Sequence, residues 1–338
     1  MPGAVSLRFE REPNYFLGAH LAGGEDRTIV AYAGDKLICL GRCSFQQRWM
    51  NGLPRQAGYL AELRLDATAR GRFSVLRRGY EYFERLQQDH PAELYFTCIA
   101  QGNAHARRVL ERGARGMPEY RCVAELETLL VAVNSRSRTP KVRLQRASQA
   151  QTPGILELLG QHGARHQLAK VWTESDLREI GSRGAPMDQW LVALEGDRVV
   201  ACGLLWDQRG FRQTVIHGYS RLLALSRPLL QMAMPIFGIP GLPRAGAPLA
   251  HAFLSPLAFA TGAETMLADF VAASFPAASS LGVDYLTLVL PAGDPRVSVL
   301  ARRFAVRIYR SLLYTVTWPG NAELAWDAKP FLPEVALL

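Results

Sequence analysis

YLAELRLDATARGRFSVLRRGYEYFER, residues 59–85, is the stretch from which the fold of this chain is inferred. Apolar and polar side chains alternate over residues 59–66, which predicts a β-strand with one buried face. Over residues 75–83 the apolar side chains recur at helical spacing, which predicts an α-helix. We therefore interpret the stretch as a strand that turns through residues 67–71 directly into a helix.

The turn between this strand and helix contains Arg70, Gly71 and Arg72. Backbone N–H groups at a helix start and guanidinium groups aimed at one point suit a pyrophosphate. The run LRLDATARGR resembles the acyl-CoA-binding strand–loop–helix of the GNAT acyltransferase superfamily, whose loop reads R/Q-x-x-G-x-G/A. Counted from Arg70, the two glycine positions of that pattern hold Phe73 and Val75, so Gly71 alone lets a phosphate approach the backbone closely. The other interpretation is an ordinary strand–helix unit with a basic, solvated turn.

Length and charge limit the possible functions. A chain of 338 residues is long enough for two domains with full cores. The net charge of +9 is uneven, because residues 1–146 hold 23 basic and 15 acidic residues while the remainder holds 16 and 15. A basic first half fits a polyanionic ligand such as coenzyme A, or an acidic acyl carrier protein. Zinc-finger spacing, an RNP-like strand and a lysine-rich tail are absent from the sequence, so no nucleic-acid partner is expected.

Cysteine usage and hydropathy predict a soluble, cytoplasmic protein. The five cysteines sit mostly in apolar, strand-like runs, as buried free thiols of a reducing compartment do. No amino-terminal signal peptide is recognisable. The longest uncharged run, residues 245–263, is interrupted by proline, histidine and hydroxyl side chains. It is typical of a loop and a buried strand rather than a membrane span.

Two pairs of segments indicate an internal duplication. VAYAGDKLICLG (30–41) aligns without gaps to VALEGDRVVACG (192–203), and both predict a hairpin about a Gly-Asp turn. ELYFTCIAQGN (93–103) matches DYLTLVLPAGD (284–294) in pattern. The two offsets, 162 and 191 residues, place about 29 extra residues in the second copy, mostly within residues 221–248.

These observations predict an α/β fold of two tandem GNAT-like modules, each with a mixed, mostly antiparallel central sheet flanked by helices. The first module is expected at residues 1–138 and the second, more degenerate one at residues 139–320. The polar, basic segment NSRSRTPK (134–141) is typical of a linker. The tail, residues 321–338, ends in the apolar FLPEVALL and is expected to pack on the body.

The GNAT resemblance implies a cofactor site in the first module. In that family a backbone N–H of the strand matching residues 59–65 holds the thioester carbonyl, and the pyrophosphate sits at the following turn. An asparagine at the start of the next helix commonly contacts the cofactor. The residues of this chain at those positions are Leu63, Arg64 and Leu65 along the pantetheine arm, Arg70, Gly71 and Arg72 at the phosphates, and Asn103 at the helix start.

Acid–base catalysis of acyl transfer needs a base for the amine and an acid for the leaving thiolate. The family often has a tyrosine seven residues after the asparagine, but this chain has Leu110 there. Glu62 is the candidate base, and the alternative is a surface carboxylate paired with Arg64 or Arg85. Tyr120 is the candidate acid, and the alternative is a tyrosine packed in the core.

The second module has little that would bind a pyrophosphate, because its corresponding loop has Gly262 but no basic residue. Its segment WDQRGFRQTVIHGY, residues 206–219, is polar and aromatic on predicted central strands. Side chains of that kind can line a substrate pocket between modules, whereas the alternative is a strand pair with one solvated face. The candidate substrate-binding residues are Trp206, Gln208, Arg212, Gln213, His217 and Tyr219.

Metal binding is not expected. His162 and His166 have a spacing that can bind zinc on a helix, but no third ligand lies nearby in sequence. A solvated helix face, within a helix predicted over residues 152–169, is the favoured interpretation. The sequence also contains no G-x-S-x-G, Cys/His nucleophile set or Walker loop, so hydrolase and NTPase functions have no support.

The function predicted is an N-acyltransferase that moves an acyl group from acyl-CoA to an amine of a small molecule or peptide, in a biosynthetic pathway. One alternative is a non-catalytic pseudo-acyltransferase acting as a ligand sensor or binding subunit. The other is an acyltransferase whose donor is an acyl carrier protein, which the basic first half would attract.

Overall fold

The structure is a computed structural model that describes residues 5–18, 21, 24–69, 73–88, 92–113, 115–133, 139–234, 239–320 and 323–338. The chain forms two compact units. The N-unit comprises Gly23–Glu127, Gly163–Val171 and Arg310–Leu338, and the C-unit comprises Met1–Ala22, Thr128–His162 and Trp172–Tyr309. Each unit combines segments from distant parts of the chain, whereas the predicted modules are contiguous stretches.

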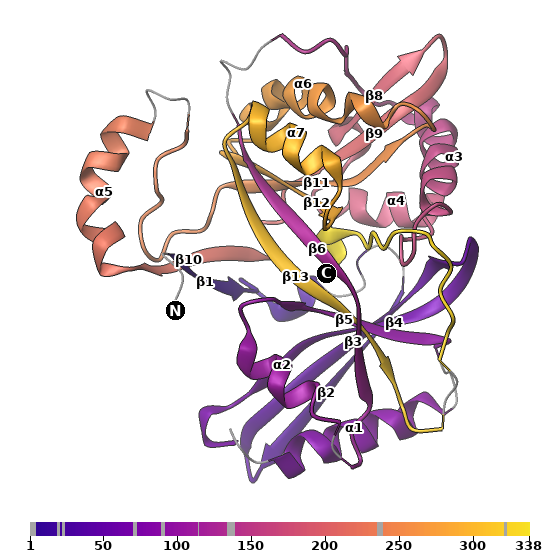
Figure 1. The fold of residues 1–338 in the computed structure, drawn as a ribbon, viewed down its shortest axis with the longest axis vertical. Helices are drawn as coiled ribbons and strands as arrows, with labels where there is room; N and C mark the ends of the chain where they lie inside the picture. The colour runs from indigo at the N-terminus through magenta and orange to yellow at the C-terminus, as the bar shows by residue number, and fades with distance from the viewer. Residues whose placement is uncertain are drawn as a thin grey trace. The chain divides into compact units, whose positions relative to one another are not determined.

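The N-unit is a sheet with helices, and its first strands are antiparallel neighbours (Figure 1). Its strand order is β2-β3-β4-β5-β13-β6. The strands are β2 Glu25–Ala33, β3 Lys36–Met50, β4 Leu53–Leu65, β5 Leu94–Ala100, β6 Glu119–Ala132 and β13 Val306–Thr317. The helices are α1 Phe73–Gln87 and α2 Ala104–Leu110. Leu76 and Phe83 of α1 pack with Tyr95 and Trp318 into one apolar core.

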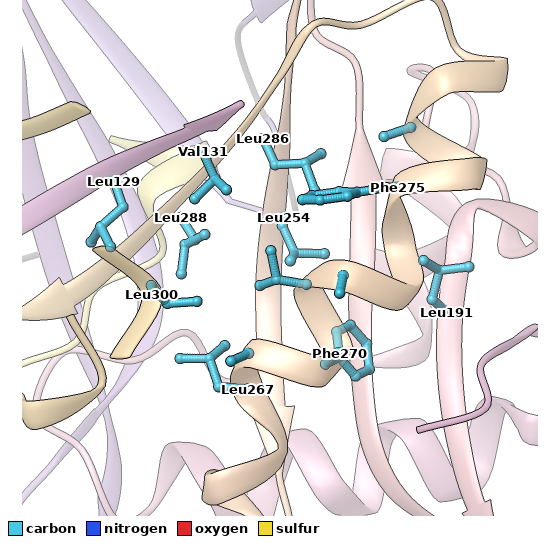
Figure 2. Packing of buried hydrophobic residues seen from close by; sticks show 14 of the residues in the cluster. Leu129, Val131, Leu191, Leu254, Leu267, Phe270, Phe275, Leu286, Leu288 and Leu300 are labelled. Carbon is cyan, nitrogen blue, oxygen red and sulfur yellow. The ribbon is translucent and has the colours of Figure 1, made fainter. Parts of the chain in front are cut away.

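The C-unit repeats this plan with more helices. Its strand order is β6-β12-β11-β9-β8-β7. The strands are β7 Gln145–Arg146, β8 Trp190–Glu195, β9 Arg198–Trp206, β11 His251–Phe259 and β12 Tyr285–Pro291. The helices are α3 Thr152–Gly163, α4 Glu174–Gly181, α6 Leu267–Ser280 and α7 Pro295–Arg303. Figure 2 shows side chains of α6, such as Phe270 and Phe275, packed with Leu254 and Leu286 of the sheet.

A separate two-stranded sheet and short helical turns complete the description. β1 Val5–Glu10 pairs antiparallel with β10 Gln213–Tyr219, and helix α5 Arg221–Ala233 follows β10. The 3₁₀ turns are η1 Tyr15–Gly18, η2 Ala67–Ala69, η3 Gln149–Gln151, η4 Met187–Gln189, η6 Glu264–Met266 and η7 Val335–Leu337.

The predicted duplication is confirmed by matching hairpins. Ala33 pairs with Lys36 across the first turn, and Glu195 pairs with Arg198 across the second, at the predicted offset of 162 residues. The register of both strand pairs shifts just before the turn, between Ala31 and Tyr32 in the first hairpin and between Ala193 and Leu194 in the second. Gly34 and Gly196 both have φ 60°, a backbone conformation that favours glycine.

The second pair of repeated segments, residues 93–103 and 284–294, matches as closely. β5 and β12 are related by the predicted offset of 191 residues at both ends and have the same burial pattern. Each is followed by a capped helix, because the side chain of Asn103 accepts from Ala106 N–H and that of Asp294 accepts from Arg296 N–H. The inserted residues of the second copy include β10 and α5.

The long strands β6 and β13 are exchanged between the two halves of the chain. β13 comes from the last part of the sequence, yet in the N-unit it pairs antiparallel with β5, from Ser311 opposite Ala100 to Val316 opposite Tyr95. Conversely, β6 comes from the first half, and its last residues lie beside β12 in the C-unit. Residues 1–138 alone would therefore lack the strand that covers one edge of β5.

Three expectations of local structure are wrong. The helix predicted over residues 152–169 ends at Gly163, because glycine is a poor helix former. His162 and His166 are each only 8% exposed rather than on a solvated face. Only Trp206 of the segment 206–219 lies on a central strand, as the last residue of β9, since β10 belongs to the separate two-stranded sheet. None of the helices in the part of the chain that the structure describes is long and apolar enough to cross a bilayer.

Candidate functional site

Strand β4 contains a bulge at Glu62. Leu40 pairs with Arg64 and Arg42 pairs with Ala61, so Glu62 and Leu63 together face the single residue between Leu40 and Arg42. Glu62 has φ 57°, which is uncommon for a residue with a side chain. Bulges re-aim side chains and backbone groups and are frequent beside active sites.

The parallel ladder between β4 and β5 ends just before this bulge. It runs from Ala57 opposite Leu94 to Tyr59 opposite Phe96. The hydroxyl of Thr97 then donates to the carbonyl oxygen of Leu60 at 2.6 Å. Beyond that point β4 and β5 form no further ladder pair within the described residues. Backbone amides at the diverging end of a strand pair are donors that a bound ligand can use.

The bulge also sets the environment of the predicted pantetheine residues. The side chain of Glu62 is 6% exposed, and its Oε2 lies 3.2 Å from Nη2 of Arg64. Leu63 and Arg64 are exposed, and Leu65 is partly buried. The Glu62–Arg64 pair was one of the two alternatives for this carboxylate, but the carboxylate is enclosed rather than on the surface.

After β4 the chain makes a tightly bonded turn. Oδ1 of Asp66 accepts hydrogen bonds from Thr68 N–H at 2.9 Å and from Lys36 Nζ at 2.9 Å. A hydrogen bond from the Thr68 hydroxyl, followed by those from Lys36 and from Thr68 N–H, holds the pKa of Asp66 well below its usual value. Lys36, a cation beside this turn, was not among the predicted site residues, although its alignment with Arg198 was visible in the sequence.

The predicted phosphate-binding residues Arg70, Gly71 and Arg72 lie outside the described residues. The structure places both ends of their loop, since η2 ends at Ala69 and α1 begins at Phe73. The strand, turn and helix predicted from residues 59–85 are confirmed up to these two points.

Helix α2 has the family's asparagine at its start but a leucine in place of the usual tyrosine, as the sequence indicated. The side chain of Asn103 caps α2 by accepting a hydrogen bond from Ala106 N–H at 3.2 Å. Leu110, at the position of the usual tyrosine, is buried in the apolar core of the N-unit. Any contact of Asn103 with a cofactor therefore has to coexist with its role as helix cap.

Tyr120 lies in the same core. Its hydroxyl is hydrogen-bonded to that of Tyr80. Burial raises the pKa of Tyr120 well above its usual value and that of Tyr80 to about 12. Both phenols are therefore protonated at neutral pH.

No local sequence pattern indicates that a second phenol lies beside α2. The hydroxyl of Tyr314, on the exchanged strand β13, donates to Glu111 and accepts from Nε of Arg107 at 3.3 Å. Burial, followed by the hydrogen bond to Glu111, raises the pKa of Tyr314 to about 12. This cluster was missed because its residues are about 200 positions apart and no local pattern joins them.

The C-unit has a similar strand arrangement without a basic turn. β11 pairs parallel with β12 from His251 opposite Tyr285 to Phe253 opposite Thr287, and the β9–β11 ladder is irregular between Leu254 and Leu257. In the turn that follows, the carboxylate of Glu264 accepts from Gly262 N–H at 2.7 Å. The Glu264 carboxylate is thus hydrogen-bonded to the Gly262 N–H, the amide that would face a phosphate if this copy bound one.

The candidate acceptor residues of the C-unit do not form one group. Trp206 is fully buried, and its indole N–H donates to Arg183 O at 3.1 Å. Gln208 is buried next to Arg212, whose guanidinium lies 5.7 Å from the ring centre of Phe253.

The other three polar residues lie on β10. His217 is exposed, the side-chain amide of Gln213 bonds the backbone of Glu12 and Arg209, and the Tyr219 hydroxyl donates to Pro243 O. The polar side chains of this segment are thus largely bonded to their own unit.

A buried histidine near this group was also missed. Nδ1 of His251 lies 2.9 Å from Oγ1 of Thr287. Burial lowers the pKa of His251 to about 4, and the nearby Arg212 contributes in the same direction. His251 is therefore neutral at physiological pH. In the described residues no group of three or more His, Cys, Asp or Glu side chains is arranged to hold a metal ion.

Comparison with known proteins identifies the fold. The sequence matches no protein-family model and no curated protein sequence. A GCN5-related N-acetyltransferase from Sphaerobacter thermophilus superposes with a TM-score of 0.56 at 14% identity, over 89% of this chain and 83% of that one. The N-myristoyltransferase of Saccharomyces cerevisiae, solved with bound myristoyl-CoA, superposes with a TM-score of 0.61 at 12% identity, over 96% and 76%. The chain has the GNAT fold.

A third solved structure extends the comparison. The glucosamine N-acetyltransferase region of a fungal multi-domain β-N-acetylglucosaminidase superposes with a TM-score of 0.59 at 11% identity. The match covers 93% of this chain but 38% of that one, so a single region of the fungal enzyme corresponds to the whole GNAT fold seen here.

Proposed function

We propose that the protein transfers an acyl group from acyl-CoA to an amine, with the donor bound in the N-unit. The observation that carries the proposal is the bulge at Glu62 together with the end of the β4–β5 ladder at Tyr59 and Phe96. Diverging strands that lead through a turn into α1 offer amides to a thioester and a helix start to a pyrophosphate. The bound myristoyl-CoA of the yeast enzyme with the same fold supports this choice of donor.

The donor would lie along β4 and its turn. A backbone N–H between Glu62 and Leu65 would donate to the thioester carbonyl and stabilise the oxyanion that forms when the amine attacks. Leu63 and Arg64 have exposed side chains, which would lie along the pantetheine arm. Arg70 and Arg72 would bind the phosphates, with the α1 N-terminus behind them.

Proton transfer in this proposal uses Glu62. The amine nitrogen attacks the thioester carbon, the new C–N bond forms, and the C–S bond breaks as the oxyanion collapses. Glu62, held by Arg64 at 3.2 Å, would accept the proton that the nitrogen loses. The leaving thiolate needs a proton in return. Tyr120 is the donor predicted from the sequence. Its raised pKa keeps it protonated but also makes it a weak acid toward a thiolate, and its hydroxyl already bonds Tyr80.

The C-unit would supply the acceptor site rather than a second donor site. The carboxylate of Glu264 at Gly262 N–H disfavours a pyrophosphate there, because like charges repel. Gln208, Arg212 and His217 remain the residues predicted to contact a small-molecule or peptide amine, although they do not form one group in the C-unit. The free cysteines fit the expected reducing cytoplasm.

Two alternatives share the same donor surface. A non-catalytic acyl-CoA sensor is favoured by one observation, the burial of Leu110 where the family tyrosine is usual. A carrier-protein donor is favoured by the basic first half of the sequence.

The experiment that tests the proposal is calorimetric titration of the purified protein with acyl-CoA, followed by assay of thiol release with a panel of amines. Binding with turnover supports the enzyme, and binding without turnover supports the sensor. Absence of binding to any acyl-CoA would remove the proposal.

A further inference from the structure

Helix α5 exposes a continuous apolar stripe. Leu222, Leu225, Leu229 and Met232 are 81%, 81%, 73% and 76% exposed. Their spacing of three, four and three residues places them on one side of the helix. Single exposed leucines are ordinary on protein surfaces, but four aligned on one helix face mark an interaction site.

The opposite side of α5 already holds the helix to its own unit. Leu223 and Leu230 are partly buried. The side chains of Arg227 and Gln231 both donate to Leu242 O, at 3.3 and 3.1 Å. Ser220 caps the helix start by accepting a hydrogen bond from Leu223 N–H. The outward stripe is therefore not required to attach α5. Figure 1 shows α5 apart from α6 and α7, the helices that cover the C-unit sheet.

The sequence that contains the stripe carries charge of one sign. Residues 210–263 contain four arginines and no aspartate or glutamate, and the preceding Arg209 is paired with Asp207. Arg221 lies at the first position of α5 and is exposed, and Arg244 is exposed in the segment that follows α5. Apolar side chains flanked by arginines without acidic neighbours are the composition of helices that lie in a membrane interface.

We propose that α5 docks on the surface of an anionic lipid bilayer. The helix axis would lie in the plane of the interface, with the four stripe residues among the acyl chains and Arg221 and Arg244 at the lipid phosphates. At 13 residues α5 is about 20 Å long, shorter than the roughly 30 Å hydrocarbon layer, so it can lie on a bilayer but not cross it.

A lipid surface fits better than a second copy of the chain. Even aromatic side chains bury only about 150–250 Å² each. Four leucine-sized side chains therefore supply less than the about 800 Å² per partner that a stable protein interface buries. Two copies of α5 would also bring like charges together, because this segment has no acidic side chain to pair with Arg221.

The test is sedimentation of the full chain with vesicles of phosphatidylcholine alone and of phosphatidylcholine mixed with phosphatidylglycerol. The wild type should partition into the anionic vesicles and leave them as salt rises. The double variant Leu225→Ser/Leu229→Ser should partition about ten- to a hundredfold more weakly, because each buried leucine contributes roughly a factor of ten. Arg221→Ala/Arg244→Ala should lose the preference for anionic over neutral vesicles.

Matched controls distinguish binding through this stripe from nonspecific hydrophobic binding to vesicles. Val299→Ser/Ile308→Ser removes two other exposed apolar side chains of the C-unit and should leave vesicle binding unchanged. Circular dichroism of every variant should match the wild type, because all the replaced side chains are exposed. The proposal is overturned if the wild type does not bind anionic vesicles, or if the control pair weakens binding as much as the leucine pair. It is equally overturned if the wild type is a dimer in solution that Leu225→Ser/Leu229→Ser converts to a monomer.

Discussion

Tyr314 donates a hydrogen bond to Glu111, a residue 203 positions earlier in the chain. The bond joins the exchanged strand β13 to the residue that follows α2, and Arg107 completes the cluster at 3.3 Å from the phenol oxygen. The pairing of β13 with β5 makes the C-terminal segment part of the N-unit core. The N-unit is thus complete only when segments from both halves of the chain are present.

Replacing Tyr314 with phenylalanine should destabilise the N-unit without changing its shape. The variant leaves the Glu111 carboxylate and Arg107 with each other but removes two hydrogen bonds to the buried phenol. We expect a loss of about 1–3 kcal/mol in the free energy of unfolding, measured by urea denaturation. Tyr309→Phe, on an exposed tyrosine of the same strand, is the control and should change little. Equal stability of Tyr314→Phe and wild type would mean that the cluster does not tie β13 to α2.

The double variant Arg70→Ala/Arg72→Ala should weaken coenzyme A binding by roughly 2–4 kcal/mol, at about 1–2 kcal/mol for each charged hydrogen bond. Calorimetry of wild type and variant gives this difference directly. Arg77→Ala/Arg78→Ala, which removes two arginines inside α1, is the control for lost positive charge.

The same site predicts a salt dependence. Affinity for coenzyme A should fall as ionic strength rises, because salt screens exposed charges. An affinity that is flat with salt, or unchanged in Arg70→Ala/Arg72→Ala, would indicate a site dominated by the acyl chain.

Glu62→Gln should lower turnover by about 100- to 10,000-fold while leaving acyl-CoA affinity nearly unchanged, as removal of a general base does. Glutamine keeps the size of the side chain and the bulge, so the backbone amides of β4 stay in place. Glu93→Gln, on the surface carboxylate that pairs with Arg55, is the control. If Glu62→Gln retains full turnover and an unchanged pH profile, Glu62 is a structural partner of Arg64 only.

Gln208→Ala and His217→Ala should reduce transfer to an identified acceptor and leave acyl-CoA binding intact, if the C-unit supplies the acceptor site. The two variants also differ from each other in expected stability. Gln208 is buried and its loss should destabilise the C-unit by about 1 kcal/mol or more, whereas His217 is exposed and its loss should not. Full turnover in both variants would leave the C-unit without a role in acceptor binding.

His251 makes stability depend on pH in a defined window. Its pKa in the folded protein is lowered to about 4 by burial, and the unfolded chain has the ordinary value near 6.5. Between these values the unfolded state binds more protons, so the free energy of unfolding should fall as pH drops from about 6.5 toward 4, by up to about 3 kcal/mol. His251→Gln should remove this component, and His105→Gln, on an exposed histidine, should keep it. Identical pH dependence in wild type and His251→Gln would contradict the assignment.

Much of the fold was predictable because its signals are local. The strand–turn–helix of residues 59–85, the hairpins about Gly34 and Gly196, and the caps at Asn103 and Asp294 each depend on neighbours within a few positions. Side-chain alternation, glycine at positive φ and Asn or Asp at a helix start express such short-range preferences directly in sequence. The repeat offsets of 162 and 191 residues came from the same local patterns.

The candidate site was predictable in outline but not in geometry. Glu62 was identifiable as a carboxylate on the strand predicted over residues 59–66, but its left-handed backbone and enclosure by the bulge arise from how β4 pairs with β3. The end of the β4–β5 ladder at Tyr59 and Phe96 likewise depends on the relative placement of two strands.

By itself, the sequence determined that the chain is a duplicated GNAT-like α/β protein whose basic turn lies in the first copy. The tertiary structure alone decided that β13 completes the N-unit sheet beside β5, that Tyr314 meets Glu111, and that α5 carries an outward apolar stripe. The reason is physical. An edge strand can pair with any strand whose side-chain alternation fits the sheet. Which of several strands hundreds of residues apart pairs with it depends on the burial and hydrogen bonding of the whole unit.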